Sequence, residues 1–65
     1  MEQKWMRASD VRARLEDPRD PHAFRVWLDR QVKVGRFPAP VRFSERVLFW
    51  PREAVDAWLS ERQSA

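Results

Sequence analysis

Residues 35–42 read Gly-Arg-Phe-Pro-Ala-Pro-Val-Arg, and they divide a segment that favours helix from one that favours strands. Gly35 is the single glycine of the chain and follows a periodic apolar segment, where a helix commonly ends in a left-handed residue. Pro38 and Pro40 stand one residue apart, which excludes a helix and favours an extended path. This stretch therefore predicts a helix end followed directly by extended chain.

The longest predicted helix precedes Gly35 and spans about residues 21–34. Asp20 and Pro21 are typical of an N-cap and a first helical residue, because the missing proline amide is not needed there. Apolar side chains recur at about 100° per residue on one side of this helix, whereas the opposite side is mostly basic. The apolar side carries Phe24, Trp27, Leu28 and Val32, and the opposite side carries His22, Arg25, Val26, Asp29 and Lys33, with Arg30 at its flank.

A shorter helix is expected N-terminal to it, over about residues 10–15. Ser9 is a good N-cap residue, and Asp10 puts an acid in the first turn, where the helix dipole favours negative charge. Residues 16–21 read Glu-Asp-Pro-Arg-Asp-Pro, a composition that predicts a turn. Two helices joined by a turn are therefore expected before Gly35.

The chain beyond the prolines favours two short strands. They are expected to form a hairpin over about residues 41–50, with the turn at 44–46. Because Val41 and Phe43 alternate with Arg42, we expect the first strand to turn its two apolar side chains to the core and Arg42 to solvent. The hairpin would thus present basic side chains on its exposed side.

The two ends of the chain complete the expected fold. Pro51 predicts the start of a third helix over about residues 51–62, with its apolar side chains at helical spacing. Residues 1–7 form a short lead-in, in which Trp5 and Met6 are expected to contact the core.

The size and composition fit a single domain over residues 1–65. Folding at this length buries only about 60% of the surface of the unfolded chain, and no cysteine is present to add a disulfide. Four Trp and four Phe supply the core, since each ring buries roughly 150–250 Å². The expected fold is α+β and mostly helical, a winged helix-turn-helix with three helices and a two-stranded β-hairpin wing. The predicted core consists of Phe24, Trp27, Leu28, Val32, Phe43, Leu48, Trp50, Val55, Trp58 and Leu59.

The positive charge of the chain is concentrated in its middle third. Residues 22–46 carry six basic and two acidic side chains, whereas residues 1–21 carry five of each and residues 47–65 carry two basic and three acidic. Eleven of the thirteen basic residues are Arg, the side chain best suited to bidentate contacts with phosphate and guanine. An Arg-rich surface that merely reflects a GC-rich genome is the alternative interpretation of this bias.

The sequence does not favour an enzyme. The single histidine, His22, has no Ser or Cys nucleophile or positioned acid beside it, and one glycine cannot form a phosphate-binding loop. One histidine without cysteine also argues against a metal site, so neither a metal nor a cofactor is expected. No apolar run approaches the roughly 18–20 residues of a membrane span. We therefore expect a soluble, non-membrane protein of the cytoplasm.

A short helix, a turn and a longer helix with a basic outer side predict a helix-turn-helix whose second helix enters the major groove of double-stranded DNA. Arg25 suits guanine, and Val26 suits a thymine methyl group. Asp29 has two possible roles, which are to accept from a cytosine amino group or to orient Arg25 or Lys33 through pairing one turn away. Predicted phosphate contacts are His22, Arg30, Lys33 and Arg36, and the predicted wing contacts are Arg42, Ser44 and Arg46.

The C-terminal half of the chain carries a recognisable pattern. Gly-Arg-Phe-Pro-Ala-Pro-Val-Arg at 35–42 and Leu-Phe-Trp-Pro-Arg-Glu-Ala-Val-Asp-Ala-Trp-Leu at 48–59 resemble the excisionase and AlpA-type regulator family, related to the DNA-binding domain of MerR-type regulators. The resemblance implies one of two related functions, or both. One is a recombination directionality factor that bends DNA so that a partner integrase excises a mobile element. The other is a small transcriptional regulator of a phage or integrative element.

Two further expectations concern partners. A lone module of this kind buries only about 600–1,000 Å² on DNA, so we expect cooperative head-to-tail self-association on adjacent sites, through the wing and the third helix. The alternative from another functional class is a protein-interaction adaptor, such as an antitoxin or anti-host factor, that uses the acidic third helix. Affinity for duplex DNA distinguishes the two hypotheses.

Overall fold

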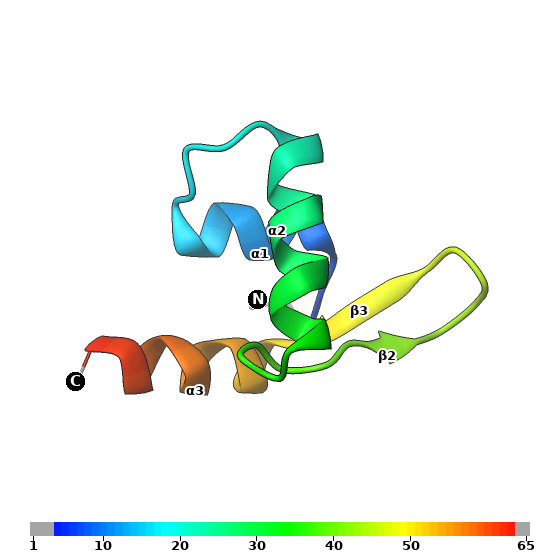
Figure 1. The fold of residues 1–65 in the computed structure, drawn as a ribbon. Coiled ribbons are helices and arrows are strands. Elements are labelled where there is room, and N and C mark those ends of the chain that lie inside the picture. Colours follow the sequence, from blue (N-terminus) through cyan, green and yellow to red (C-terminus); the bar gives the residue numbers. More distant parts are fainter. Residues whose placement is uncertain (1–3, 64–65) are drawn as a thin grey trace.

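A computed structural model describes residues 4–63, which form a small, mostly helical α+β fold (Figure 1). No helix within these residues is long and apolar enough to cross a lipid bilayer. The elements follow in the order β1 (Trp5–Met6), α1 (Ala8–Leu15), α2 (Pro21–Lys33), β2 (Val41–Arg42), β3 (Leu48–Pro51) and α3 (Arg52–Gln63).

The sheet has three antiparallel strands in the order β1-β3-β2, whereas the sequence predicts two. The predicted hairpin is present as β2 and β3, in which Val41 pairs with Phe49. The third strand, β1, comes from the lead-in, where Met6 pairs with Trp50. A strand of two residues is too short to show an alternating pattern, so no sequence signal distinguishes it from a loop.

Two helices begin at other residues than predicted. Helix α1 begins at Ala8, because Arg7 occupies the N-cap position and its amide donates a 3.0 Å hydrogen bond to Oδ2 of Asp10. Ser9 is therefore not the N-cap residue but lies within the first turn. Helix α3 begins at Arg52 and not at Pro51, because Pro51 is still paired with β1.

Helix α2 begins at Pro21 as predicted, and the Asp20 carboxylate accepts a 3.0 Å hydrogen bond from the Ala23 amide. The helix ends at Lys33, and Gly35 follows with a left-handed φ of 78°. Its amide donates to the Val32 carbonyl at 3.1 Å. The prediction that the single glycine ends this helix is therefore confirmed.

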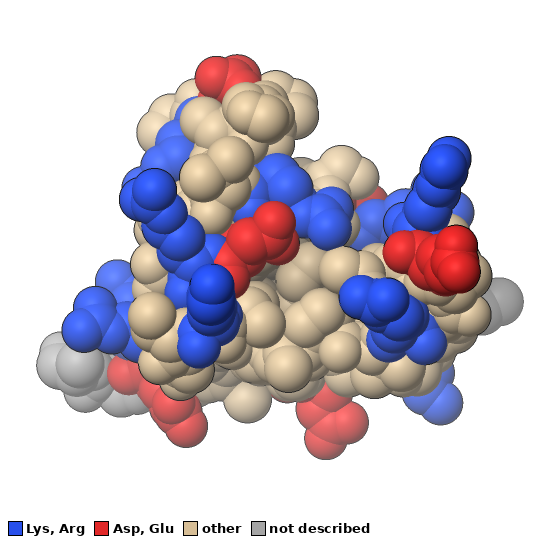
Figure 2. All heavy atoms as spheres, turned by 45° about the vertical axis from the view of Figure 1, so that its right-hand side comes forward, with Lys and Arg blue, Asp and Glu red and all other residues tan. Residues whose placement is uncertain are grey.

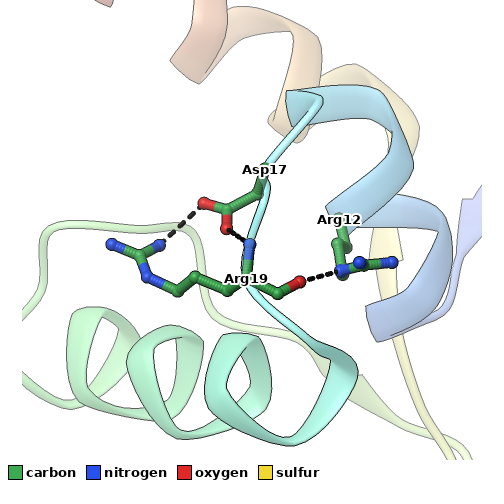
Figure 3. Close-up of polar contacts among 3 residues, drawn as sticks. All are labelled: Arg12, Asp17 and Arg19. Carbon is green, nitrogen blue, oxygen red and sulfur yellow. Dashed lines mark hydrogen bonds and ion pairs between the residues drawn. The ribbon is translucent and has the colours of Figure 1, made fainter.

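The turn between α1 and α2 is held by polar contacts of Arg19 (Figure 3). The Arg19 carbonyl accepts from Nε of Arg12 at 2.6 Å, so the turn is tied back to α1. The Asp17 carboxylate accepts from the Arg19 amide at 2.9 Å and pairs with its guanidinium at 2.7 Å. These contacts fix the direction in which α2 leaves the turn.

The buried core contains four of the ten predicted residues and three others. Trp27, Val32, Leu48, Trp58 and Leu59 are only partly buried and pack around this core. Phe43 is 54% exposed, so its assignment to the core is wrong. The buried core consists of Met6, Val11, Phe24, Leu28, Phe37, Trp50 and Val55.

The exposed position of Phe43 follows from the register of the sheet. Paired residues share a face and faces alternate along a strand, so Arg42 lies on the same face as buried Trp50. Phe43 lies on the opposite face, beside Phe49 at 4.7 Å and Trp5 at 5.1 Å between ring centroids. These three residues are called the outer aromatic cluster. The predicted orientation of the first strand is therefore wrong, because the hairpin extends away from the helices and β2 does not reach the core (Figure 1).

Residues 36–40, the linker segment between α2 and β2, are held by two tryptophans. Nε1 of Trp50 donates to the Pro38 carbonyl at 2.9 Å, and Nε1 of Trp58 donates to the Arg36 carbonyl at 2.7 Å. Between these bonds, the Phe37 ring is 4% exposed and lies 4.8 Å from the Trp58 ring. The linker segment thus follows one path over β3 and α3.

Replacing Trp50 by Phe should destabilise the protein, because it keeps an aromatic ring but removes the donor that binds the Pro38 carbonyl. An unpartnered buried acceptor costs about 1–3 kcal/mol, and the lost volume adds to this cost. Urea unfolding followed by circular dichroism measures the change. Val34→Ala is the control, since Val34 is 65% exposed and its loss should change stability by less than about 0.5 kcal/mol. Coincident unfolding curves for Trp50→Phe and the parent would contradict this role of the indole.

Candidate nucleic-acid interface

Helix α2 presents one side to solvent because two residues on its other side, Phe24 and Leu28, are fully buried. Val26 is 42% exposed, which is unusual for an apolar residue and leaves its methyl groups free for contact. All six predicted site residues of this helix are exposed, namely His22, Arg25, Val26, Asp29, Arg30 and Lys33.

Arg25 and Asp29 form an ion pair, with Nε 3.2 Å from Oδ1, one turn apart on this side. Both side chains are largely exposed, so the pair contributes only about 0.3–0.5 kcal/mol to stability. The contact supports the second of the two roles considered for Asp29, which is to orient Arg25. The bond uses Nε of Arg25, so the terminal nitrogens of its guanidinium remain available to a ligand.

The other predicted residues of α2 lie at its two ends. His22 is in the first turn, whereas Arg30 and Lys33 are in the last, about 16 Å further along the axis for Lys33. Arg36 is exposed just beyond the helix end, and its carbonyl is the one held by Trp58. The structure therefore places Arg30, Lys33 and Arg36 near the C-terminal end of α2, whereas His22 lies at the opposite end.

The hairpin supplies the remaining predicted residues, Arg42, Ser44 and Arg46, and all three are exposed. The turn is closed by the Val47 amide, which donates to the Ser44 carbonyl at 3.3 Å. Arg42 lies on the core-facing side of the sheet and not on its outer face, as described above. The hairpin therefore carries two exposed arginines, Arg42 on the core-facing side of the sheet and Arg46 in the turn.

The exposed sides of α2 and the hairpin flank a hollow (Figure 2). Lys and Arg side chains stand over both elements, and the surface between them is mostly uncharged. An open notch of about 260 Å³ lies between α1, α2 and the hairpin. Three arginines line the notch, which are Arg7, Arg25 and Arg46. The structure thus brings together two predicted residues and one, Arg7, that sequence reasoning missed.

Arg7 was missed because its position depends on tertiary structure. Residues 1–21 sum to zero charge, so the charge count gives no weight to a single arginine among them. The available signal was local, since Asp10 three residues later is typical of a side chain that binds an N-cap amide. With Arg7 recognised as the N-cap residue, it would have been placed at the exposed start of α1.

The chemistry of this surface is that of anion contact. Within residues 4–63, no group of three or more His, Asp or Glu side chains is positioned to hold a metal ion. The guanidinium groups are exposed and donate several hydrogen bonds each, which suits oxyanions such as phosphate. No family model, curated protein or solved structure matches this chain.

Removing the Asp20 side chain should destabilise α2 and with it the exposed side that carries Arg25. The hydrogen bond from the Ala23 amide is the main cause that lowers the pKa of Asp20 from its usual value of 3.8. A carboxylate with a lowered pKa stabilises the fold above its usual pKa, and this stabilisation is lost as the pH falls through the lowered value. We expect Asp20→Ala to lower Tm at neutral pH, and Asp20→Asn to lower it less, because asparagine also caps helices.

Thermal unfolding of both variants between neutral and strongly acidic pH measures this effect. The difference between the parent and Asp20→Ala should shrink as the pH falls. Glu61→Gln, which removes an exposed carboxylate of α3, is the control and should leave Tm unchanged at neutral pH. A difference between the parent and Asp20→Ala that stays constant over the whole pH range would contradict the role of the ionised carboxylate.

Proposed function

We propose that this protein binds double-stranded DNA as a winged helix-turn-helix, with α2 in the major groove and the β2–β3 hairpin as the wing. The observation that carries the proposal is the hollow flanked by the basic sides of these two elements (Figure 2). A helix with its side chains is about 10–12 Å wide, which fits a major groove about 12 Å wide.

In this proposal Arg25 reads guanine, with Asp29 holding its guanidinium in position at 3.2 Å. The exposed methyl groups of Val26 suit a thymine methyl. The remaining basic residues contact the sugar-phosphate backbone and fix the register of the helix on the duplex. These phosphate contacts are assigned to His22, Arg30, Lys33 and Arg36 on and after α2, and to Arg42, Ser44 and Arg46 on the wing.

The biological role that fits such a module is architectural or regulatory. Its resemblance to excisionases and AlpA-type regulators supports a recombination directionality factor that assists an integrase, a small transcriptional regulator of a mobile element, or both. Footprinting on the attachment site and on the upstream region of the encoding element distinguishes the two. Protection at the attachment site supports excision, and protection at a promoter supports regulation.

The competing role as a protein-interaction adaptor receives less support from α3. The Asp56 carboxylate is engaged within the fold, by Nε of Arg14 at 3.1 Å and by Nε of Arg52 at 3.5 Å. Only Glu53 and Glu61 remain as exposed acids of this helix. The acidic surface of α3 is therefore smaller than its sequence indicates.

Arg25→Ala should weaken binding to the preferred duplex by about 1–3 kcal/mol and relax the preference for guanine at one position. Selection from a random duplex library gives the preferred sequence, and fluorescence anisotropy measures affinity at several salt concentrations. Parent affinity should fall steeply with added salt, because bound phosphates release their counterions. Arg62→Ala, on α3, is the control and should retain both affinity and preference. A parent protein that binds no duplex even at low salt, but captures a protein partner independently of salt, would support the adaptor instead.

Binding to adjacent sites should be cooperative, since a single module buries too little surface for high affinity. Mobility-shift titrations on duplexes with one site and with two adjacent sites measure this directly. We expect the two-site duplex to pass from free to doubly bound with little singly bound species. Independent filling of the two sites would contradict head-to-tail association through the wing and α3.

A further inference from the structure

We propose that Arg7 and Arg46 bind a single phosphate group of the DNA backbone at this notch, while Arg25, which also lines it, keeps the guanine contact proposed above. This inference rests on the proposed function and adds a site that neither the sequence pattern nor the resemblance assigns. The three arginines come from three separate parts of the fold, which are the N-cap of α1, the exposed side of α2 and the tip of the hairpin.

Two of the three guanidinium groups are held in place without any ligand. The Arg7 guanidinium lies 5.5 Å from the centroid of the Phe49 ring, within the range of a cation–π contact. The Arg25 guanidinium is held by Asp29 at 3.2 Å through Nε alone. A guanidinium that is already partly ordered loses less conformational entropy when it binds an anion.

The backbone adds donors on the same wall. Val11 is the first residue of α1 whose amide reaches a helical acceptor, the Arg7 carbonyl at 2.9 Å. The amides of Ala8 and Ser9 precede it, and amides at these positions have no acceptor within a helix. Both residues line the notch. The helix start also carries Asp10, whose carboxylate accepts from the Arg7 amide at 3.0 Å and offsets part of the partial positive charge there.

The form of the notch favours a phosphate that belongs to a polymer. Its volume of about 260 Å³ is many times that of one water molecule, and it is open to solvent, so a phosphate can enter with its chain continuing on both sides. It also lies between the two elements assigned to the DNA grooves. A phosphate held there would set the position of the wing relative to α2 on the duplex, which is the usual function of backbone contacts.

The test compares Arg7→Gln with Arg62→Gln. Both changes remove one exposed arginine whose guanidinium lies over an aromatic ring, at 5.5 Å from Phe49 for Arg7 and at 4.9 Å from Trp58 for Arg62. Arg7→Gln should weaken binding roughly fivefold to tenfold on preferred and unrelated duplexes alike, and lower the slope of log affinity against log salt by about 1. Arg62→Gln should leave both quantities at parent values. Arg46→Gln is the second variant and should reproduce the Arg7→Gln result.

Duplexes in which one phosphate at a time is replaced by an uncharged methylphosphonate locate the contact. At the seated phosphate, the replacement should weaken parent binding and abolish the further loss caused by Arg7→Gln. If the parent binds duplexes and Arg7→Gln behaves as Arg62→Gln does, the notch proposal is overturned and the proposed function stands. If the parent binds no duplex, both are overturned.

Titration with inorganic phosphate, followed by the NMR shifts of the Ala8 and Ser9 amides, separates the two sources of phosphate. Weak, unsaturated shifts with the inorganic ion, together with the duplex results above, support a backbone phosphate. Saturable binding of the inorganic ion that Arg7→Gln abolishes without any effect on duplex affinity would identify a site for a free anion and overturn the proposal.

Discussion

The fold depends on two indole N–H groups that bind carbonyls of the linker segment. Trp50 of β3 holds Pro38, and Trp58 of α3 holds Arg36, while the Phe37 ring lies between them in the core. The carbonyls of Arg36 and Pro38 lie outside the helices and strands, and the two indoles supply their partners. Because the segment joins α2 to the hairpin, its path sets the angle between them. The shape of the hollow on the candidate interface follows from that angle.

Local signals predict most of the fold, and the missed strand and the missed core residue Phe37 share one cause. Helix α2 and the hairpin follow from a proline-capped apolar repeat and a Pro-x-Pro break, which depend on neighbouring residues only. The strand at Met6 and the burial of Phe37 depend on partners far along the chain, so the sequence pattern contains no sign of them. Phe43 and Arg42 do lie on opposite faces of the sheet, as their alternation predicts, but the alternation does not reveal which of the two faces meets the core.

The residues of the candidate site also differ in whether local signals predict them. Residues on the exposed side of α2 are predictable because helical periodicity assigns the side opposite Phe24 and Leu28 to solvent. That Arg7 and Arg46 line the same notch is not predictable, because this requires the start of α1 to lie beside residues 46–48 of the hairpin. Charge counted by segment therefore gives no sign of which individual arginines share a surface.

The strand order limits the ability of copies of this protein to associate through the edges of their sheets. β3 lies in the middle and is paired on both sides, so the outer edges of the sheet belong to β1 and β2, each two residues long. Edges this short offer too few backbone donors and acceptors to template the addition of a foreign strand. Within residues 4–63, the fold thereby carries an exposed aromatic face on its sheet without a long edge from which aggregation could grow.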